Sequence, residues 1–264
     1  MEASSHGLHQ NRLDGLFFNS AIFTNLSQDH LDYHKNFKNY LNAKLYLFQN
    51  LIKKAGFVIT DDKIPEFKKI KNISLKKQLK LFTLKNKFFQ IVSHNYKNEA
   101  QILKIKHKNL IHEIRVNLVG KIQLKNILMA VIAASKSNLD LKKIFSVIPR
   151  LSSVEGRFEK IGKIKNKSLV FLDYAHTPDA LQTCILNIRE QFPDKHISLL
   201  FGCGGDRDKG KRSKMGKISD KYADKIYLTD DNPRHEKPKK IRNEIKRGIK
   251  KVELLKFLIE KKQS

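Results

Sequence analysis

The sequence predicts an α/β protein built from two domains, of which the second carries a parallel sheet. After residues 149–156 the chain alternates short hydrophobic strands with helices, which is the order of a Rossmann-like parallel sheet. Polar loops follow three of these strands, as they do where ligands bind at the carboxyl ends of strands. With 264 residues, of which 40% are hydrophobic, the chain is long enough to bury two cores.

The first part, residues 1–150, is expected to begin with a buried strand at 16–25, where apolar residues run almost without interruption. A helix should cover most of 30–51, because large apolar side chains recur there at helical spacings. The hydrophobic run at 55–60 is expected to form a second short strand. Between about 70 and 120, Lys/Asn turns separate β-branched and aromatic runs, a pattern that predicts antiparallel strands.

An Ala-rich run at 125–138 predicts a helix, and another is expected after Asp140, whose carboxylate suits an N-cap. The pattern changes near residue 150, where we place the domain boundary, so the second part comprises residues 151–264. Strands and helices alternate strictly in this part. The strands are expected at 168–173, 196–201 and 225–229, and the helices at 178–192, 213–223 and 238–250.

The net charge of +27 comes from 53 Lys and Arg residues against 26 Asp and Glu, which raises the question of nucleic-acid binding. Only ten of the basic residues are Arg, the side chain best suited to clamp phosphates and read bases. The Lys residues are spread over the whole chain, which favours a solvated surface. We therefore expect small-molecule chemistry with anionic substrates and no nucleic-acid partner.

No run of about 18 apolar residues is present, so neither a transmembrane helix nor a membrane partner is expected. The first twelve residues lack the basic and apolar segments of a signal peptide. Cys184 and Cys203 allow at most one disulfide and no zinc framework. A cytoplasmic protein is the expected class.

Two of the polar loops carry arginines in unusual surroundings. Residues 205–212 nearly match the phosphate-binding pattern G-x4-G-K-[ST], but Arg212 stands where the magnesium-binding hydroxyl should be. We interpret the segment as a ligand loop in which Arg207 contacts a carboxylate or phosphate; the alternative is a charged, solvated turn. Residues 231–234 offer a Pro-fixed turn and a planar guanidinium that suits a carboxylate, although Asn-Pro turns are common.

His30 and His34 are spaced to lie on one face of a helix, which is a common arrangement of metal ligands. No third ligand of zinc type lies nearby in the sequence, so the pair leaves metal binding open. Lys44 lies on the apolar flank of the same predicted helix. A surface lysine is the ordinary interpretation, and a desolvated amine that reacts with carbon dioxide is the alternative.

Taken together, these segments resemble the Mur ligase family. The resemblance implies an incomplete central ATPase-type α/β domain at 1–150, without its phosphate loop, and a partial Rossmann-like C-terminal ligase domain at 151–264. The matching stretches follow the family's order and leave out mainly residues 60–120. They are MEASSHGLHQNR (1–12), FTNLSQDHLDYH (23–34), NAKLYLF (42–48), EGRFE (155–159), DYAHTPDAL (173–181), FGCGGDRDKGKR (201–212) and TDDNPRHEKP (229–238).

In this family ATP activates a carboxylate as an acyl phosphate, which the amine of an amino acid then attacks. The resemblance implies ATP and Mg²⁺ as cofactors, with Glu2, His30 and a carbamate on Lys44 holding the metal. It implies catalytic roles for His30, Lys44 and His176, the last near the transferred phosphate. The other implied contacts are Ser4, Gln10 and Arg12 with the UDP-muramoyl dipeptide, Asn126, Arg157, Asp173 and His176 with ATP, and Arg207, Asp231, Asn232, Pro233 and Arg234 with the incoming amino acid.

The tetrapeptide at 231–234 indicates which amino acid is added. Relatives that add lysine lack its Arg, and meso-2,6-diaminopimelate differs from lysine by a second carboxylate, which a guanidinium fork complements. A buried charge left unpaired would disfavour the wrong substrate. The resemblance therefore implies addition of meso-diaminopimelate to UDP-N-acetylmuramoyl-L-alanyl-D-glutamate in peptidoglycan synthesis, the process that builds the cell wall and supports cell division.

The chain also departs from the family pattern. The UDP-binding domain and a Gly-x-x-Gly-Lys-Thr phosphate loop are expected to be missing, and residues 250–264 do not resemble the family's C-terminal segment. We therefore expect negligible ATP turnover by this chain alone. The alternative to a ligase portion is an inactive fragment that retains only nucleotide or precursor binding. A basic nucleic-acid-binding protein is the third hypothesis.

Overall fold

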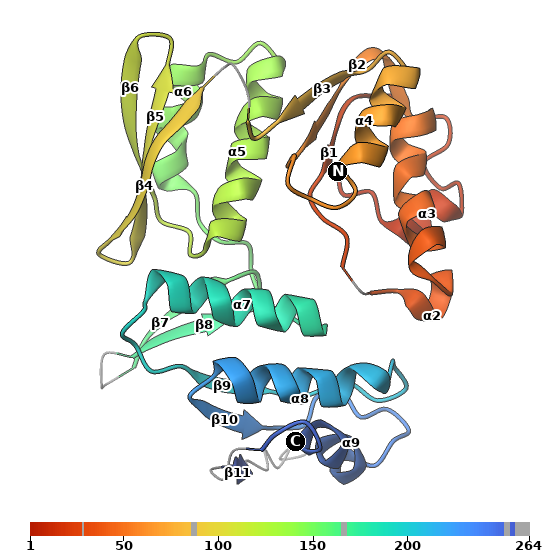
Figure 1. Cartoon of the computed structure of the whole chain (residues 1–264), viewed down its shortest axis with the longest axis vertical. Helices are drawn as coiled ribbons and strands as arrows, with labels where there is room; N and C mark the ends of the chain where they lie inside the picture. Colours follow the sequence, from red (N-terminus) through yellow and green to blue (C-terminus); the bar gives the residue numbers. More distant parts are fainter. Residues whose placement is uncertain (28, 86–88, 165–167, 251–253, 257–264) are drawn as a thin grey trace, which may run out of the picture. The chain divides into compact units, whose positions relative to one another are not determined.

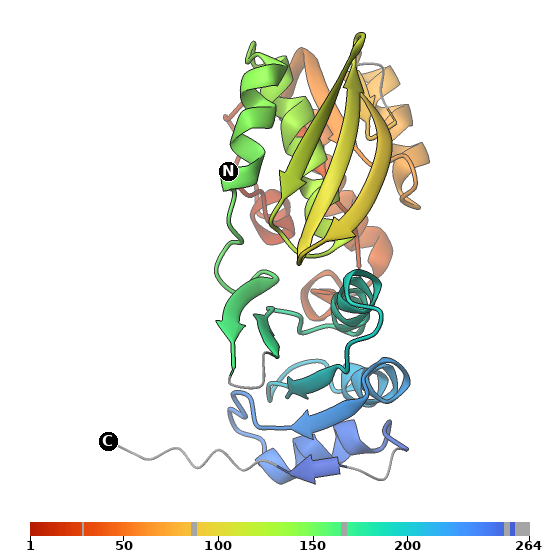
Figure 2. The ribbon, with the colours of Figure 1, turned by 90° about the vertical axis from the view of Figure 1, so that its left-hand side faces the viewer.

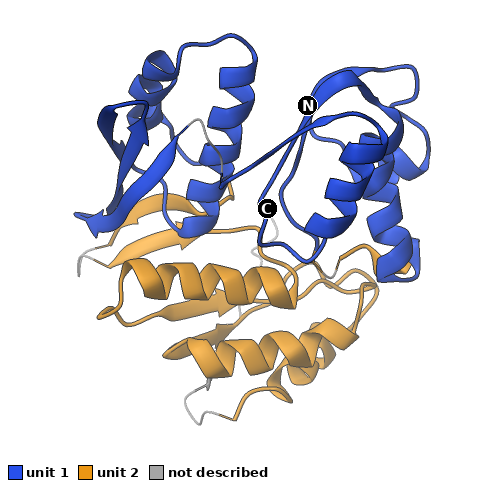
Figure 3. Cartoon of the chain, turned by 45° about the horizontal axis from the view of Figure 1, so that its top comes forward, with its two compact units in different colours: residues 1–26, 33–153 blue, residues 27–32, 154–264 orange. Residues whose placement is uncertain are grey.

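Helices and strands alternate along the chain, which confirms the predicted α/β class (Figure 1). The chain divides into two compact units (Figure 3): unit 1 holds residues 1–26 and 33–153, and unit 2 holds residues 27–32 and 154–264. A short segment from the first half of the sequence thus belongs to unit 2. No helix among the described residues is long and apolar enough to cross a membrane. This computed structural model describes residues 1–27, 29–85, 89–164, 168–250 and 254–256.

Unit 1 contains a three-stranded parallel sheet, β1 (Phe18–Phe23), β2 (Ile52–Thr60) and β3 (Lys80–Thr83), in that order. The two predicted strands are confirmed as β1 and β2. The expectation of antiparallel strands from residue 70 is wrong for the start of that region. There α4 (Phe67–Lys76) buries Ile70 and carries the chain back, so that β3 joins β2 in parallel.

The predicted long helix is interrupted. A four-residue helix, α2 (Leu31–His34), ends before Lys35, whose φ is 68°, and a separate helix, α3 (Phe37–Asn50), starts after Asn36. The side chain of Asn36 accepts a hydrogen bond from the backbone of Asn39 at 2.9 Å, which caps α3. A short helix, α1 (Ser5–His9), precedes these elements. The core against the parallel sheet consists of Ala21, Phe23, Leu41, Leu45, Phe48, Val58, Ile70 and Leu79.

The second layer of unit 1 is the predicted antiparallel sheet with two helices on one face (Figure 2). Asp140 caps the second helix as predicted, since its carboxylate accepts from the backbone of Lys143 at 3.1 Å. A 3-10 turn, η1 (Ile148–Arg150), follows. The strands are β4 (Gln90–Lys97), β5 (Ala100–His107) and β6 (Leu110–Val116), and the helices are α5 (Lys121–Lys136) and α6 (Leu141–Val147).

Unit 2 contains a parallel sheet in the order β11-β10-β9, with a core that includes Ile185, Met215 and Ile226. The first strand expected in this sheet instead pairs antiparallel with a strand that the sequence did not reveal. That pair is β7 (Glu159–Lys163) and β8 (Leu169–Leu172). The sheet strands are β9 (Ser198–Phe201), β10 (Lys225–Leu228) and β11 (Leu254–Lys256), and the helices are α7 (Pro178–Gln191), α8 (Gly210–Tyr222) and α9 (Pro238–Lys246).

Candidate functional site

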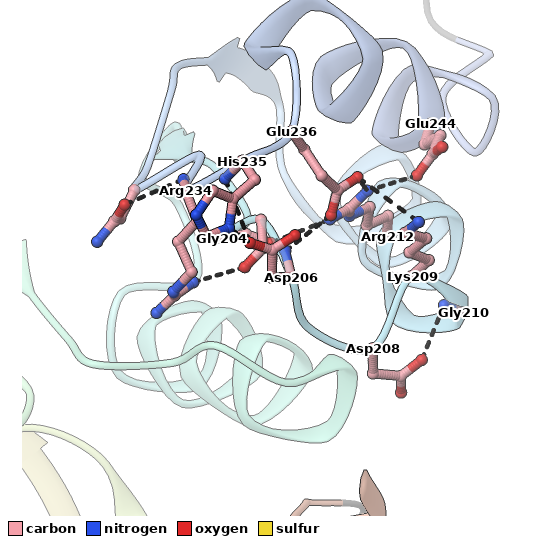
Figure 4. A network of polar contacts seen from close by, with 12 residues as sticks. Gly204, Asp206, Asp208, Lys209, Gly210, Arg212, Arg234, His235, Glu236 and Glu244 are labelled. Carbon is pink, nitrogen blue, oxygen red and sulfur yellow. Dashed lines mark hydrogen bonds and ion pairs between the residues drawn. The ribbon is translucent and has the colours of Figure 1, made fainter.

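Two loops of unit 2 meet at the carboxyl ends of neighbouring parallel strands: loop A (residues 202–209) after β9 and loop B (residues 229–237) after β10. Parallel strands place their following loops at one edge of the sheet, as the sequence predicts here. The backbone N–H of Gly205 donates to the carbonyl of Asn232 at 2.8 Å, and that of Asp206 donates to the Glu236 carboxylate at 2.8 Å. The two loops therefore form one hydrogen-bonded unit (Figure 4).

The glycines of loop A permit this close approach. A Cβ atom on Gly205 would lie 1.8 Å from the carbonyl oxygen of Pro233, and one on Gly202 would lie 2.6 Å from that of Thr229. Any side chain at either position would overlap the backbone of loop B. The Gly-rich sequence is thus explained by contact between the loops.

Arg234 points its guanidinium back toward loop A (Figure 4), where Nη1 donates to the carbonyl of Gly205 at 2.6 Å. Its backbone has a φ of 48°, and its N–H donates to the side-chain oxygen of Asn232 at 3.2 Å. Both Arg234 and Arg207 are exposed. Within the described ranges, neither arginine takes part in an ion pair.

Carboxylates of the two loops have cationic or backbone partners other than these arginines. Asp206 pairs with His235 at 2.7 Å, and this hydrogen bond lowers the pKa of Asp206. Asp230 forms an ion pair with Arg242, and Asp208 accepts from the backbone of Gly210 at 2.8 Å. The positive charge of Arg207 and Arg234 is therefore not neutralised by these carboxylates.

The central cation of the network is Arg212 on α8, whose side chain is fully buried (Figure 4). Its Nη1 and Nη2 donate to the two oxygens of Glu236 at 2.9 and 2.8 Å, and Nη1 also donates to Glu244 on α9 at 2.7 Å. Nη2 donates in addition to the carbonyl of Gly204 at 3.1 Å. The hydrogen bonds from Arg212 hold the pKa of Glu236 well below its usual range.

Sequence reasoning treated Arg212 only as a residue that breaks a phosphate-loop pattern, and Glu236 was not singled out. The spacing of residues along α8 could have shown that Arg212 is buried. Arg212, Met215, Gly216 and Ser219 are all buried, and their offsets of three, four and seven residues define one helix face. An arginine on a buried face requires carboxylate partners, which Glu236 and Glu244 provide.

A second cluster in unit 2 centres on His176, whose Nε2 lies 3.3 Å from a carboxylate oxygen of Asp29. Its other ring nitrogen, Nδ1, donates to the carbonyl of Tyr174 at 3.1 Å. The hydrogen bond with Asp29 raises the pKa of His176 against the opposing effect of burial. Burial likewise opposes ionisation of Asp29, but His176 and His30 outweigh it and lower the pKa of Asp29 to about 2.

Asp173 and Arg157 lie on segments that adjoin this cluster. The Asp173 carboxylate accepts from the backbone of Phe158 at 2.9 Å, and burial raises the pKa of Asp173. The guanidinium of Arg157 lies over the ring of Tyr174, 4.9 Å from its centroid. The structure thus brings Arg157, Asp173 and His176 to neighbouring segments of unit 2. Asp29 was not predicted as a site residue, because nothing in its sequence context indicates its contact with His176.

In unit 1, the predicted precursor-binding residues surround α1. The hydroxyl of Ser4 caps this helix by accepting from Gly7 at 3.1 Å, and the amide of Gln10 donates to the hydroxyl of Tyr33 at 3.0 Å. Arg12 is exposed. These contacts fix Ser4 and Gln10 in place without any ligand.

The residues expected at magnesium are divided between the units, with Glu2 and Lys44 in unit 1 and His30 in unit 2. The amine of Lys44 lies 5.5 Å from the centroid of the Tyr40 ring. His34 is buried, and its Nε2 lies 3.0 Å from the Ser5 hydroxyl, so this ring packs in the interior. Among the residues that the structure describes, no group of three or more His, Cys, Asp or Glu is placed to hold a metal.

Asn126 lines a pocket of about 570 Å³ in unit 1. The pocket lies between α5 and the segment formed by α6 and η1, and its walls are almost entirely apolar. The other lining residues are Ile127, Ala130, Val131, Ala134, Leu139, Lys143, Ile144, Val147, Ile148 and Leu151. The size and lining are typical of a small-molecule site with few polar contacts.

The contact between His176 and Asp29 makes the charge of His176 depend on this carboxylate. Because the folded-state pKa of His176 is raised, the ion pair stabilises the fold below the ordinary histidine pKa, and this contribution is lost as pH rises through the raised value. Asp29→Asn should lower the pKa of His176, which an NMR titration of its imidazole in buffer without divalent ions measures. The exposed control Asp194→Asn should leave it unchanged, and an unshifted pKa in Asp29→Asn would contradict the contact.

The approach of Gly205 to Pro233 is tested by Gly205→Ala. The added Cβ would overlap a backbone oxygen, so we expect a loss of roughly 1–3 kcal/mol in the free energy of unfolding. In the matched control Gly210→Ala, the Cβ would meet only the Asp208 side chain at 3.1 Å, at the start of a helix that alanine favours. Denaturant unfolding of both variants measures the difference, and equal stabilities would show that the loops are not packed in this way.

Comparison with known proteins gives two family matches: the Mur ligase middle domain over residues 1–134 and the glutamate ligase domain of Mur ligases over residues 156–261. The UDP-N-acetylmuramoyl-L-alanyl-D-glutamate–2,6-diaminopimelate ligase of Rickettsia bellii (strain RML369-C) is 40% identical over 94% of this chain and 52% of its own length. That of Agrobacterium fabrum is 36% identical over 93% of this chain and 50% of its own.

Solved structures show the same relationship. A structure of UDP-N-acetylmuramoyl-L-alanyl-D-glutamate–2,6-diaminopimelate ligase has a TM-score of 0.63 at 31% identity, covering 98% of this chain and 54% of that one. Folylpolyglutamate synthase of Mycobacterium tuberculosis, complexed with ADP, shares the fold, with a TM-score of 0.70 at 17% identity over 90% of this chain and 53% of that one. The chain spans about half the length of the curated relatives it matches. With both of its units matched by domains of one family, the chain belongs to the Mur ligases.

Proposed function

We propose that this chain forms the nucleotide- and amino-acid-binding portion of an ATP-dependent ligase that joins meso-diaminopimelate to UDP-N-acetylmuramoyl-L-alanyl-D-glutamate. The observation that carries the proposal is the setting of Arg234, which is anchored to the Gly205 carbonyl and takes part in no ion pair among the described residues. The names of the relatives that match 93–94% of the chain support the same reaction.

Diaminopimelate carries two amino acid groups, and therefore a second carboxylate that lysine lacks. Arg234 presents a planar fork of donors that suits a carboxylate, and Arg207 adds a second cation on the neighbouring loop. In loop B, Asp231 and the Asn232 side chain provide acceptors for an ammonium group. A site with these groups binds a zwitterion with an additional negative charge more tightly than one without it.

For ATP, the pocket beside Asn126 provides apolar walls for a flat base, and the Asn126 amide supplies a donor and an acceptor for its edge. In unit 2, Arg157 and Asp173 would contact the nucleotide and His176 the phosphate that is transferred. His176 is suited to that role because Asp29 favours its protonated, cationic form. A fixed cation next to the transferred phosphate stabilises the charge that develops on its oxygens.

The donor set expected at magnesium fits the ion by chemistry, since Mg²⁺ prefers oxygen ligands and keeps several waters. In unit 1, Glu2 supplies a carboxylate and a carbamate on Lys44 would supply another anionic oxygen. The ion would neutralise charge on the phosphates. The amine of Lys44 lies over the rings of Phe23 and Tyr40, 6.0 and 5.5 Å from their centroids.

The proposed reaction has two steps, which these positioned and charged groups would promote. A carboxylate oxygen of the muramoyl dipeptide attacks the γ-phosphorus of ATP, and ADP leaves. The neutral amine of diaminopimelate, held by loops A and B, attacks the acyl carbon. Phosphate leaves with the electron pair of its bond to that carbon, and the amine nitrogen loses a proton to water. Positioning and charge neutralisation suffice for both steps, so no serine or cysteine nucleophile is required. Cys203 agrees with this view, because burial raises the pKa of its thiol to about 11.

The second candidate is an inactive polypeptide that retains only ligand binding. The observation in its favour is that the 264 residues contain no Gly-x-x-Gly-Lys-Thr sequence. An assay with ATP, diaminopimelate and the muramoyl dipeptide separates the two, with the rest of a homologous ligase supplied as a second polypeptide. Amide product supports the ligase, and binding without product supports the second candidate.

The role of Arg234 predicts the behaviour of Arg234→Lys. The variant keeps the charge but loses the fork, so the affinity for meso-diaminopimelate should fall about 10- to 100-fold, while that for L-lysine changes less. Isothermal titration of the whole chain with both ligands measures this, and Arg247→Lys, an exposed arginine outside the loops, is the matched control. Equal affinities of wild type and Arg234→Lys for both ligands would overturn the assignment.

A further inference from the structure

Arg212 contacts the two loops that carry Arg207 and Arg234. Its own side chain is fully buried and cannot reach a ligand. Its guanidinium contacts loop A through the carbonyl of Gly204 and loop B through the carboxylate of Glu236 (Figure 4). Arg212 lies outside both loops, on α8, and adds these contacts to the hydrogen bonds that the loops make directly with each other. Arg212 therefore contributes to the position of one loop relative to the other.

The contacts around Glu236 extend this connection. One of its oxygens accepts from both Arg212 and the backbone of Asp206, so the carboxylate of loop B also holds the residue that precedes Arg207. On the other loop, Arg234 donates to the carbonyl of Gly205, next to the Gly204 carbonyl that Arg212 binds. A change at Arg212 would thus displace the anchoring points of both ligand arginines.

Arg212 also removes negative charge from the site. Glu236 and Glu244 are mostly buried, and without Arg212 they would leave one or two unpaired carboxylates beside the loops. Such charges would repel a ligand carboxylate or attract the ligand arginines. Because Arg212 pairs with both carboxylates, these carboxylates do not pair with Arg207 or Arg234. The two exposed arginines can therefore pair with a ligand carboxylate.

We propose that Arg212, acting with Glu236, is a positioning residue for amino-acid recognition: it sets the separation of loops A and B and thereby the discrimination between meso-diaminopimelate and lysine. The proposal rests on the function proposed above for these loops. Lysine cannot replace Arg212, because a single ammonium group cannot give the paired contact to Glu236 together with those to Glu244 and Gly204.

The test compares Arg212→Lys with Arg189→Lys. Arg189 on α7 is the control because its guanidinium likewise binds both a carboxylate and a carbonyl, those of Asp224 at 2.6 Å and Lys195 at 2.7 Å, away from both loops. Isothermal titration with meso-diaminopimelate and with L-lysine is done at a temperature at which circular dichroism shows all variants folded. Arg212→Lys should lose at least about tenfold in affinity for meso-diaminopimelate and less for lysine, so that selectivity falls, while Arg189→Lys keeps both affinities.

A purely structural role would lower both affinities by the same factor, since only the folded fraction would change, and that result would overturn the proposal. Unchanged affinities in Arg212→Lys would overturn it too. If the wild-type chain binds no diaminopimelate, the proposed function fails, and amide hydrogen exchange then decides the positioning role alone. Exchange at Gly205, whose N–H bonds to loop B, should be faster in Arg212→Lys than in wild type or Arg189→Lys; unchanged exchange would overturn the inference.

Discussion

The organisation of unit 2 depends on a buried guanidinium that must be neutralised where it lies. Arg212 is withdrawn from water on the inner face of α8, and the cost of burying its charge is offset only if carboxylates and carbonyls surround it. Glu236 comes from loop B, Glu244 from α9 and the carbonyl of Gly204 from loop A. One side chain therefore links α8 and loop A to loop B and α9, which follow about 20 residues later in the sequence.

This constraint separates two kinds of arginine within a small region. Arg212 is paired with two carboxylates and inaccessible, whereas Arg207 and Arg234 are exposed and lie outside the ion pairs of the described residues. Three carboxylates of loops A and B pair with His235, Arg242 and Arg212 rather than with the two ligand arginines. Asp206, Asp230 and Glu236 are thus already paired, and the guanidinium groups of Arg207 and Arg234 can donate to an anionic ligand.

Much of this could be predicted from local sequence, because strands followed by polar loops show where ligand residues gather. The alternation of strands and helices was sufficient for the α/β class and for most elements, including the Asp140 cap. It was insufficient for β3 and β8, because whether a short apolar strand pairs in parallel or antiparallel depends on distant partners. The periodic apolar pattern predicts one continuous helix over residues 30–51. The helix is broken at Lys35, because Asn36 caps a new helix there.

The residues of the site likewise divide into those that local sequence reveals and those that depend on long-range contacts. Arg234 and Arg207 stand out in sequence because unusual loops carry them, whereas Arg212 and Asp29 act through partners 24 and more than 100 residues away. Such long-range contacts leave little trace in one sequence beyond the helical spacing around Arg212. The proposed joint action of Glu2, Lys44 and His30 likewise stays a prediction, since these residues belong to different units.

The central claim is that loops A and B together form the site that recognises the second carboxylate of the amino acid. The most direct measurement is amide chemical-shift mapping of the isotopically labelled chain during titration with meso-diaminopimelate. We predict saturable shifts concentrated in residues 203–207 and 231–235, with smaller shifts for L-lysine at the same concentrations. Saturable shifts centred elsewhere in the chain, or identical responses to the two amino acids, would contradict the account.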